Sequence, residues 1–185
     1  MKVKDVISAA LNILGRAELA KALGDGAALG EEGEETVNTL LYCFNSAEDE
    51  LARKYIPLTF KERLSSNDGK YRFVVFVHTP VRINKVYSGG KQISFSVEPQ
   101  YLVADAKEIE VEYDYCPKRK KLEDSSDYGA EVGEYVLATG AAAEYCLING
   151  EAEAYGKWEE KYREAIDVKQ KKLPVCASIP PRRWI

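Results

Sequence analysis

Histidine is almost absent from the sequence, which has a single one, His78, among 185 residues. Nucleophilic catalysis usually places a serine, cysteine or threonine beside a histidine base. His78 precedes Thr79 and Pro80 at the expected end of a strand, where no partner is evident, so we interpret it as a structural side chain. Lysine and acidic residues are common, but the sequence singles out none of them as a catalytic group. We therefore predict that the protein is not an enzyme.

Closely spaced cysteines are also lacking. The four cysteines are far apart and form no C-x-x-C pair; they are Cys43, Cys116, Cys146 and Cys176. Zinc sites need closely spaced cysteines or a nearby histidine, and neither occurs. We therefore expect no metal and no cofactor. The first residues predict an amphipathic helix rather than an export signal, so the thiols should stay reduced in a cytoplasm.

Two further absences narrow the class of partner. No run of apolar residues approaches the roughly 18 that a membrane-spanning helix needs, so no membrane association is expected. Positive charge is not in excess, since 26 lysine and arginine residues face 30 acidic ones and the formal net charge is −4. Proteins that grip nucleic-acid phosphates normally carry a basic excess. The charge balance therefore argues against a dedicated nucleic-acid-binding protein.

Helical periodicity marks both ends of the chain. Apolar residues recur every three to four positions from Val3 to Leu14, and residues 16–23 are expected to add a short helical piece. A longer apolar stripe runs from Val37 to Tyr55 and predicts a long helix. Two more helices are expected within residues 124–173, the first with its N-cap at or just after Asp124.

In the middle of the chain the apolar period changes from about 3.6 to 2, which is typical of strands. Val81–Tyr87 and Ile93–Val97 flank Ser88-Gly89-Gly90-Lys91 and predict a hairpin closed by a glycine turn. A second hairpin is expected between residues 100–103 and 108–115. The sequence therefore predicts an α+β protein, a helical bundle of about four helices with an inserted antiparallel β-hairpin sheet.

We treat residues 1–185 as one domain with four parts. These are the N-terminal helices (1–57), the β insertion (58–117), the C-terminal helices (124–173) and an extended C-terminal tail (174–185). The basic run Lys118–Lys121 lies between the second and third parts. It is either a solvated connection or a contact with an acidic face of a neighbouring subunit.

Four acidic residues alternate with apolar ones near the end of the β insertion. Because successive side chains of a strand point to opposite faces, the four carboxylates should share one face. They are Glu108, Glu110, Glu112 and Asp114. Three interpretations remain open: a solvated sheet face, a cation site, or a negative wall that faces a channel or a neighbouring subunit and repels phosphate.

The last residues of the chain are unusually apolar and basic for a terminus. The side chains expected to bury there are Ile179, Arg182, Arg183, Trp184 and Ile185. Leaving a large apolar side chain in water is unfavourable by about 1.5–3 kcal/mol. Arginine and tryptophan also dominate the energetics of protein interfaces. We expect this tail to dock, either on the chain's own surface or on another subunit or partner.

The order of these features resembles a known group of proteins. The residues that carry the resemblance are Ile7–Gly15, Pro80–Val86, Val111–Pro117, Ala141–Leu147 and Trp158–Ala165. In layout and spacing the chain is similar to the head-to-tail adaptor (connector) proteins of tailed bacteriophages, which include the tail tubular protein of short-tailed phages. The resemblance spans nearly the whole chain.

The resemblance implies a structural role in the virion neck for a protein made in the cytoplasm of the bacterial host. It implies a homo-oligomeric ring of about twelve copies that joins the portal protein to a downstream tail or nozzle protein. DNA would pass through the ring only as cargo. By position, the tail from Arg182 to Ile185 is the candidate contact with the portal or a neighbouring adaptor.

Two other classes of function remain as alternatives. The first is a small non-catalytic binding module whose hairpin sheet recognises a peptide or a sugar, which the twelve tyrosines would suit. The second is a hydrolase that uses carboxylates, which is the weakest because no acidic residue is distinguished from the rest.

Overall fold

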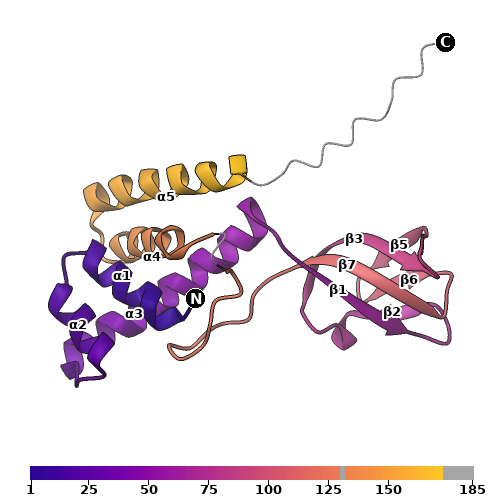
Figure 1. The fold of residues 1–185 in the computed structure, drawn as a ribbon, viewed down its shortest axis with the longest axis horizontal. Helices are drawn as coiled ribbons and strands as arrows, with labels where there is room; N and C mark the ends of the chain where they lie inside the picture. Colours follow the sequence, from indigo (N-terminus) through magenta and orange to yellow (C-terminus); the bar gives the residue numbers. More distant parts are fainter. Residues whose placement is uncertain (130–131, 173–185) are drawn as a thin grey trace, which may run out of the picture.

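A computed structural model describes residues 1–129 and 132–172. These residues form a helical lobe and a β lobe, which lie side by side along the longest axis of the molecule (Figure 1). The helices are α1 (Val3–Ile13), α2 (Ala17–Asp25), α3 (Gly30–Glu50), α4 (Glu134–Ile148) and α5 (Ala152–Lys172). A π-helical turn, Leu51–Tyr55, extends α3 toward the β lobe. No helix in the described part of the chain is long and apolar enough to cross a membrane.

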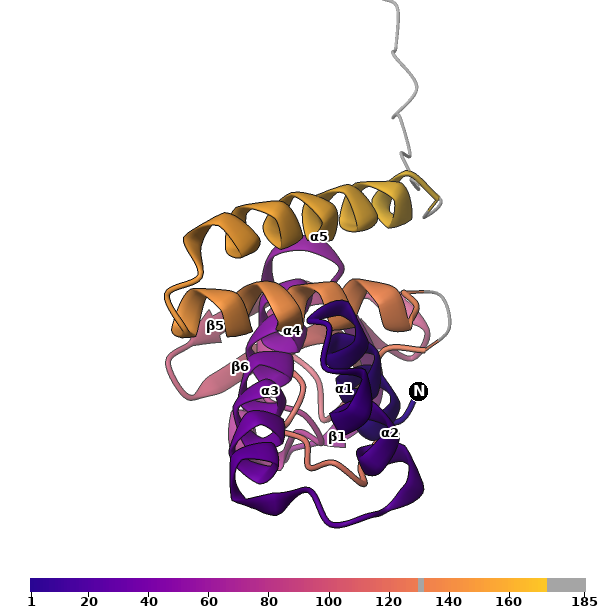
Figure 2. The same ribbon diagram turned by 90° about the vertical axis from the view of Figure 1, so that its left-hand side faces the viewer.

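Helix α4 is the centre of the helical lobe. It packs against α1, α3 and α5, and most of its residues from Val136 to Cys146 are buried. Figure 2 shows α5 as an outer layer above α4, with α1 and α3 beneath α4. Small residues allow this close approach: a Cβ atom added to Gly140 would lie 2.9 Å from the Tyr162 ring and 3.1 Å from Cβ of Ala47. The helices therefore enclose one apolar core.

The β lobe is built from seven strands in two antiparallel sheets. The strands are β1 (Leu58–Ser65), β2 (Lys70–Arg72), β3 (Pro80–Ser88), β4 (Lys91–Gln92), β5 (Phe95–Glu98), β6 (Tyr101–Ala104) and β7 (Glu108–Tyr115). One sheet has the order β1-β7-β3-β4 and the other β2-β6-β5. A separate apolar core joins Tyr71 and Leu102 of the smaller sheet to Val86, Val111 and Tyr113 of the larger.

The expected bundle of about four helices with a single inserted hairpin sheet is wrong. Five helices and seven strands in two sheets are present within the described residues. The short helical piece expected over residues 16–23 is confirmed as α2, which continues to Asp25 and is capped by Gly26, whose φ of 70° suits a helix terminus. Helix α4 begins at Glu134, well after the N-cap expected at or after Asp124.

The two-sheet arrangement has a physical cause. The turn at Gly89 and Gly90 does pair Ser88 with Lys91, but the chain then leaves the larger sheet, and β5 pairs with β6. Strands β6 and β7 do not form the expected second hairpin, because they belong to different sheets. The apolar face of β7 needs a cover to be buried, and the smaller sheet supplies it.

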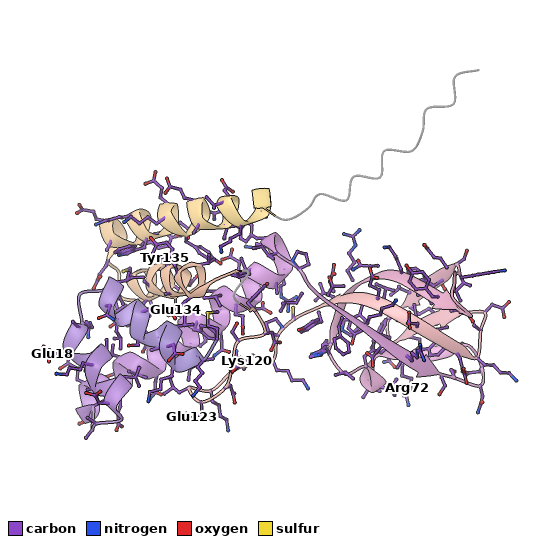
Figure 3. All side chains as sticks on the ribbon, viewed as in Figure 1. Glu18, Arg72, Lys120, Glu123, Glu134 and Tyr135 are labelled. Carbon is purple, nitrogen blue, oxygen red and sulfur yellow. The ribbon has the colours of Figure 1, made fainter. Side chains whose placement is uncertain are left out.

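Two segments of chain join the lobes (Figure 1). Leu58 starts β1 and packs against both cores. The return segment after β7 is held on α3 by Asn45, whose side chain accepts a hydrogen bond from Lys120 N at 2.6 Å and donates one to Lys120 O at 3.1 Å. Figure 3 shows Lys120 beside the helical lobe on this segment. The Tyr128 hydroxyl donates to Ile56 O at 2.6 Å, which ties the outgoing and returning segments together.

Candidate functional site

The larger sheet has one charged face, formed by alternate residues of its three longer strands. Along β7 the apolar residues are buried and the four acidic residues are exposed or partly exposed. The pairing register places basic residues of β1 and β3 opposite them, namely Lys61, Arg63, Arg82 and Lys85. Four acidic and four basic side chains therefore balance on this surface, which we call the charged face.

Most of the acidic residues on the charged face have partners. Glu110 forms ion pairs with Lys61 at 2.6 Å and with Arg63 at 3.3 Å. These interactions hold the pKa of its carboxyl group below the usual value. Glu112 lies 3.7 Å from the ammonium group of Lys85. This balance does not favour a strongly negative wall. It accounts for the exposed carboxylates as members of a mixed-charge surface.

Asp114 occupies the end of the charged face nearest the helical lobe. Its carboxylate accepts hydrogen bonds from the Thr59 hydroxyl at 3.0 Å and the Asn84 amide at 2.7 Å. No group of three or more histidine, cysteine or acidic residues within 1–129 and 132–172 is arranged to hold a metal ion. The four acidic residues of β7 are thus brought to one face without converging on a point.

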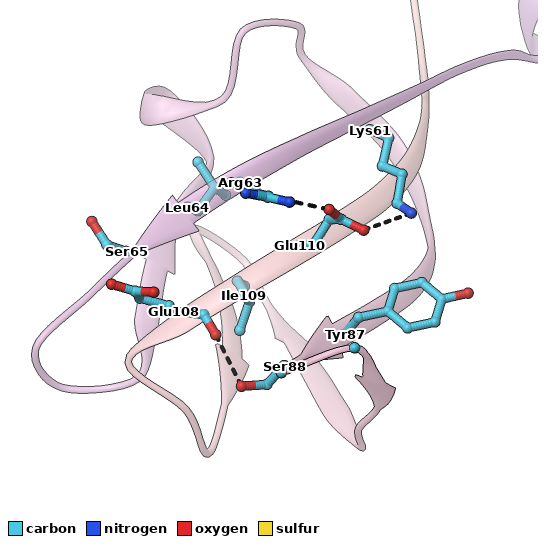
Figure 4. Close-up of a pocket in the computed structure, with 11 residues that line it drawn as sticks. Lys61, Arg63, Leu64, Ser65, Tyr87, Ser88, Glu108, Ile109 and Glu110 are labelled. Atoms are coloured by element: carbon cyan, nitrogen blue, oxygen red, sulfur yellow. Dashed lines mark hydrogen bonds and ion pairs between the residues drawn. The ribbon is translucent and has the colours of Figure 1, made fainter.

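A hollow of about 730 Å³ lies on the charged face beside the turn between β3 and β4 (Figure 4). Charged and hydroxyl side chains line it together with the apolar Leu64 and Ile109. The Lys61 ammonium group is 5.1 Å from the centre of the Tyr87 ring. The Ser88 hydroxyl donates to the backbone carbonyl of Glu108 at 3.0 Å, which cannot act as a general base. The hollow can therefore bind a polar group, but it holds no activated nucleophile.

The lone histidine belongs to an aromatic cluster. The His78 ring stacks on Tyr115 with centroids 4.0 Å apart, and the Phe60 ring meets it edge-on at 4.8 Å. Its Nδ1 atom is buried and has no hydrogen-bond partner among the described residues. The Tyr113 hydroxyl donates to Glu62 at 2.5 Å and accepts from the backbone N–H of His78. This environment suits a packing role.

The three described cysteines are free thiols and poor nucleophiles. Burial raises the pKa of Cys43 to about 12 and that of Cys146 to about 11. Burial, with a smaller contribution from the neighbouring Asp49, raises the pKa of Cys116 to about 11. A thiolate, not a thiol, is the reactive form of cysteine. These residues therefore offer no activated sulfur at neutral pH.

A buried carboxyl group fastens the return segment to α3. Glu48 is 0% exposed, and its Oε1 accepts hydrogen bonds from the Ser126 hydroxyl at 2.5 Å and Asp127 N at 3.1 Å. Lys120 forms an ion pair with Asp127 beside it. Oε2 of Glu48 has no partner in the part of the chain that the structure describes. Burial outweighs the stabilising contacts and raises the pKa of this carboxyl group.

Sequence reasoning missed Glu48. A signal was present, because Glu48 lies four residues after Phe44 and therefore falls on the apolar stripe of the helix. Within the basic run Lys118–Lys121, Lys120 forms an ion pair with Asp127 of the same chain, whereas Lys118 and Arg119 are exposed. The tail residues Ile179, Arg182, Arg183, Trp184 and Ile185 lie outside the described residues.

Replacing Glu110 with glutamine is expected to make the charged face attract DNA, because it frees Lys61 and Arg63. The logarithm of the DNA-binding constant falls linearly with the logarithm of the salt concentration, and each phosphate contact makes this slope more negative by about 0.9. Two freed cations should therefore make the slope more negative by about 2. Fluorescence anisotropy with a labelled duplex, between about 50 and 200 mM salt, measures this slope.

Glu108→Gln is the matched control for this variant. It removes the same charge, but no ion pair involves the Glu108 side chain within the described residues. The control should therefore leave the salt dependence close to that of the wild type. Equal slopes for the two variants would show that ion pairing on the charged face does not restrain its cations.

The sequence matches no model of a protein family, and no curated protein is significantly similar to it.

Proposed function

We propose that the chain is a structural virion protein that forms a ring, joins a phage portal to the tail and surrounds the DNA exit channel. The observation that carries this proposal is that each lobe exposes a group of apolar side chains. On the helical lobe Tyr42 is 59% and Ile148 52% exposed. On the β lobe Val74 is 81% exposed, and Val75 and Val77 are more than half exposed.

Two unlike apolar surfaces on one chain suit assembly into a ring. Contiguous exposed apolar surface commonly marks a site of protein association. A contact between two different surfaces repeats from copy to copy, and it closes into a ring when the rotation between copies divides a full turn. Two self-sufficient cores joined by two segments of chain also suit a subunit that contacts neighbours with both lobes.

The charges agree with DNA as passing cargo. The charged face is balanced and the whole chain has a formal charge of −4, so DNA would find few sites at which to stick. A portal protein on one side and a tail or nozzle protein on the other are the partners that this role requires. Between these two partners, the protein would lie at the virion neck.

Electron microscopy of the purified chain, alone and mixed with its cognate portal protein, tests the proposal. We expect closed rings that stack on the portal, with a mass near twelve times 20.7 kDa measured by mass photometry. A chain that stays monomeric and does not bind the portal would remove the basis of the proposed function.

The hollow beside Tyr87 favours a second candidate, a non-catalytic module that binds a peptide or a sugar. Ligand sites combine an apolar or aromatic surface with a few placed polar groups. Titrating isotope-labelled protein with short oligosaccharides and peptides would then shift the amide signals of Ser65, Ser88 and Gly89. Unchanged signals would rule out this candidate for those ligands.

A further inference from the structure

The helical lobe and the β lobe have separate apolar cores. Within residues 1–129 and 132–172, a single side chain packs against both cores, and it belongs to Leu58. Leu58 is the first residue of β1, at the point where the chain enters the β lobe (Figure 1). Two parts of a chain are expected to move relative to each other unless a large apolar interface joins them. The lobes lack a common core that would fix the angle between them.

The outgoing segment of the chain is anchored on the helical lobe as far as Ile56. The backbone N–H of Ile56 donates to Leu51 O at 2.8 Å, which closes the π-helical turn. Tyr55 O accepts a hydrogen bond from the Gln170 side chain of α5 at 2.8 Å, and Ile56 O accepts one from the Tyr128 hydroxyl at 2.6 Å. Up to this residue the backbone is held by the helical lobe.

The return segment is anchored on the helical lobe again from Lys120 onward. The Asn45 side chain of α3 binds both the N–H and the carbonyl group of Lys120. Glu48 of α3 accepts hydrogen bonds from the Ser126 hydroxyl and from Asp127 N. The part of the return segment that can move freely therefore ends before Lys120.

On the β side, the ladder between β1 and β7 stops at the same level on both strands. Leu58 pairs with Tyr115, and the pairing continues from there toward the far end of the lobe. Just beyond this pair, Pro57 lies on the outgoing segment and Pro117 on the return segment. Proline has no N–H group to donate to a ladder. The sheet therefore cannot extend along both segments into the helical lobe.

A short stretch of each segment lies between these anchors. Pro57 and residues 117–119 form no backbone hydrogen bond with any residue in the described part of the chain. We call Pro57 and residues 117–119 the hinge. The contacts that cross the hinge are made by side chains: Leu58 packs on the helical core, and the Cys116 thiol interacts with the carboxylate of Asp49 on α3.

We propose that the β lobe turns as a rigid body about the hinge, and that Leu58 holds the resting angle by packing on both cores. Hinges are a few residues at the ends of elements, which absorb changes in the backbone torsions. Strand β7 has 8 residues and is about 26 Å long, so a turn of about 15° would move its far end by about 7 Å.

This motion has a consequence for binding, which does not depend on the proposed ring function. A ligand shifts a conformational equilibrium toward the state that it binds better. A partner that contacts both lobes would therefore select one angle, and a partner that contacts one lobe would leave the angle free.

Double electron–electron resonance between spin labels on the two lobes tests the hinge. Labels attached through an azide-bearing amino acid at Glu18 and Lys91, both exposed, leave the native cysteines unchanged. Lys91 pairs with Ser88 at the end of the β lobe farthest from the hinge. A label pair within the helical lobe, at Glu18 and the exposed Glu160, gives the width that the labels themselves contribute.

In the wild-type protein, the distance distribution between the lobes should be broader than the reference distribution by roughly 7 Å. Equal widths for the two label pairs would overturn the inference. This comparison uses the unaltered hinge and both cores, so it does not depend on whether any core variant folds.

Leu58→Ala tests the role of Leu58. Removing the side chain that packs on both cores should broaden the distribution between the lobes further. Leu64→Ala is the matched control, because Leu64 lies on the same strand but packs only on the β core among the described residues. Circular dichroism verifies that both variants fold. A distribution no broader in Leu58→Ala than in Leu64→Ala would refute the proposal that Leu58 holds the angle.

The outcomes separate this inference from the proposed function. Wild-type rings on the portal, together with equal widths for the two label pairs of the free chain, would sink the hinge and leave the ring function standing. A broad distribution in a chain that neither forms rings nor binds the portal would support the hinge and remove the neck function.

Discussion

Replacing Glu48 with alanine is expected to lower the free energy of unfolding by about 2–3 kcal/mol at pH 5, because it leaves buried partners unsatisfied. The Ser126 hydroxyl and Asp127 N would both lose their acceptor, and a small cavity would remain on α3. Asp127 would keep its ion pair with Lys120, but the return segment would lose its buried anchor. Urea denaturation followed by circular dichroism measures the change.

The pH dependence of this effect has a definite sign. The pKa of Glu48 is raised in the folded state, so the group contributes stability that is fully present below its unfolded pKa of about 4.3 and is lost as the pH rises through the folded pKa. Lys120, Asp127, Tyr115 and Tyr128 are the charged and titratable neighbours that face it. The difference in free energy of unfolding between the wild type and the alanine variant should therefore become smaller as the pH rises.

Glu48→Gln is the matched control. Glutamine keeps an acceptor for Ser126 and Asp127 but cannot ionise. The Glu48→Gln variant should therefore lose less stability than the alanine variant, and its free energy of unfolding relative to the wild type should increase as the pH rises. A wild-type protein whose stability relative to Glu48→Gln is constant from about pH 4.5 to about pH 8, a range that begins just above the ordinary carboxyl pKa of about 4.3, would contradict a raised pKa in the folded state.

Replacing Gly140 with leucine is expected to destabilise the helical lobe by about 3 kcal/mol, because the site has no room for a side chain. Even a Cβ atom would lie 2.9 Å from the Tyr162 ring and 3.1 Å from Cβ of Ala47. Tyr162 is buried and its hydroxyl donates to Ala47 O at 3.4 Å, so the ring cannot swing away without breaking this contact. Thermal and urea unfolding both report the loss.

The same substitution at Gly156 is expected to have the opposite effect on stability. Gly156 also lies inside a helix, but apart from its chain neighbours and the backbone of its own helix no atom is within 4 Å of the position of its Cβ. Leucine there should stabilise the protein by about 0.5–1 kcal/mol, because glycine is a poor helix former. If both leucine variants were stabilised, the close packing of α3, α4 and α5 around Gly140 would be refuted.

Part of the fold follows from local patterns alone. The amphipathic stripes predict α1 and α3, since a helix repeats its faces every 3.6 residues. The period-2 alternation of residues 108–115 appears in the burial of β7, and the two glycines after Ser88 form the expected tight turn. In each case the physical determinant lies within a few residues along the chain.

The partners of these elements could not be read in the same way. A helix was expected to begin at or just after Asp124, yet Ser126 in this segment contacts Glu48 on α3, far away in the sequence. The alternation in β7 left a solvated face, a cation site and a negative wall open, and only the register brought Lys61, Arg63 and Lys85 beside the acidic residues. Strand pairing depends on which surfaces bury one another, and a single strand does not carry that information.

The sequence by itself determined that the protein has a single histidine, no excess of basic charge, helices at both ends and strands between, because composition and periodicity are properties of the chain. Only the tertiary structure decided that the strands form two sheets, that Glu48 is a buried anchor, and that the charged face is balanced. It also decided that apolar groups remain exposed on both lobes. These features arise from contacts between distant segments, whose energies appear only when the chain is packed.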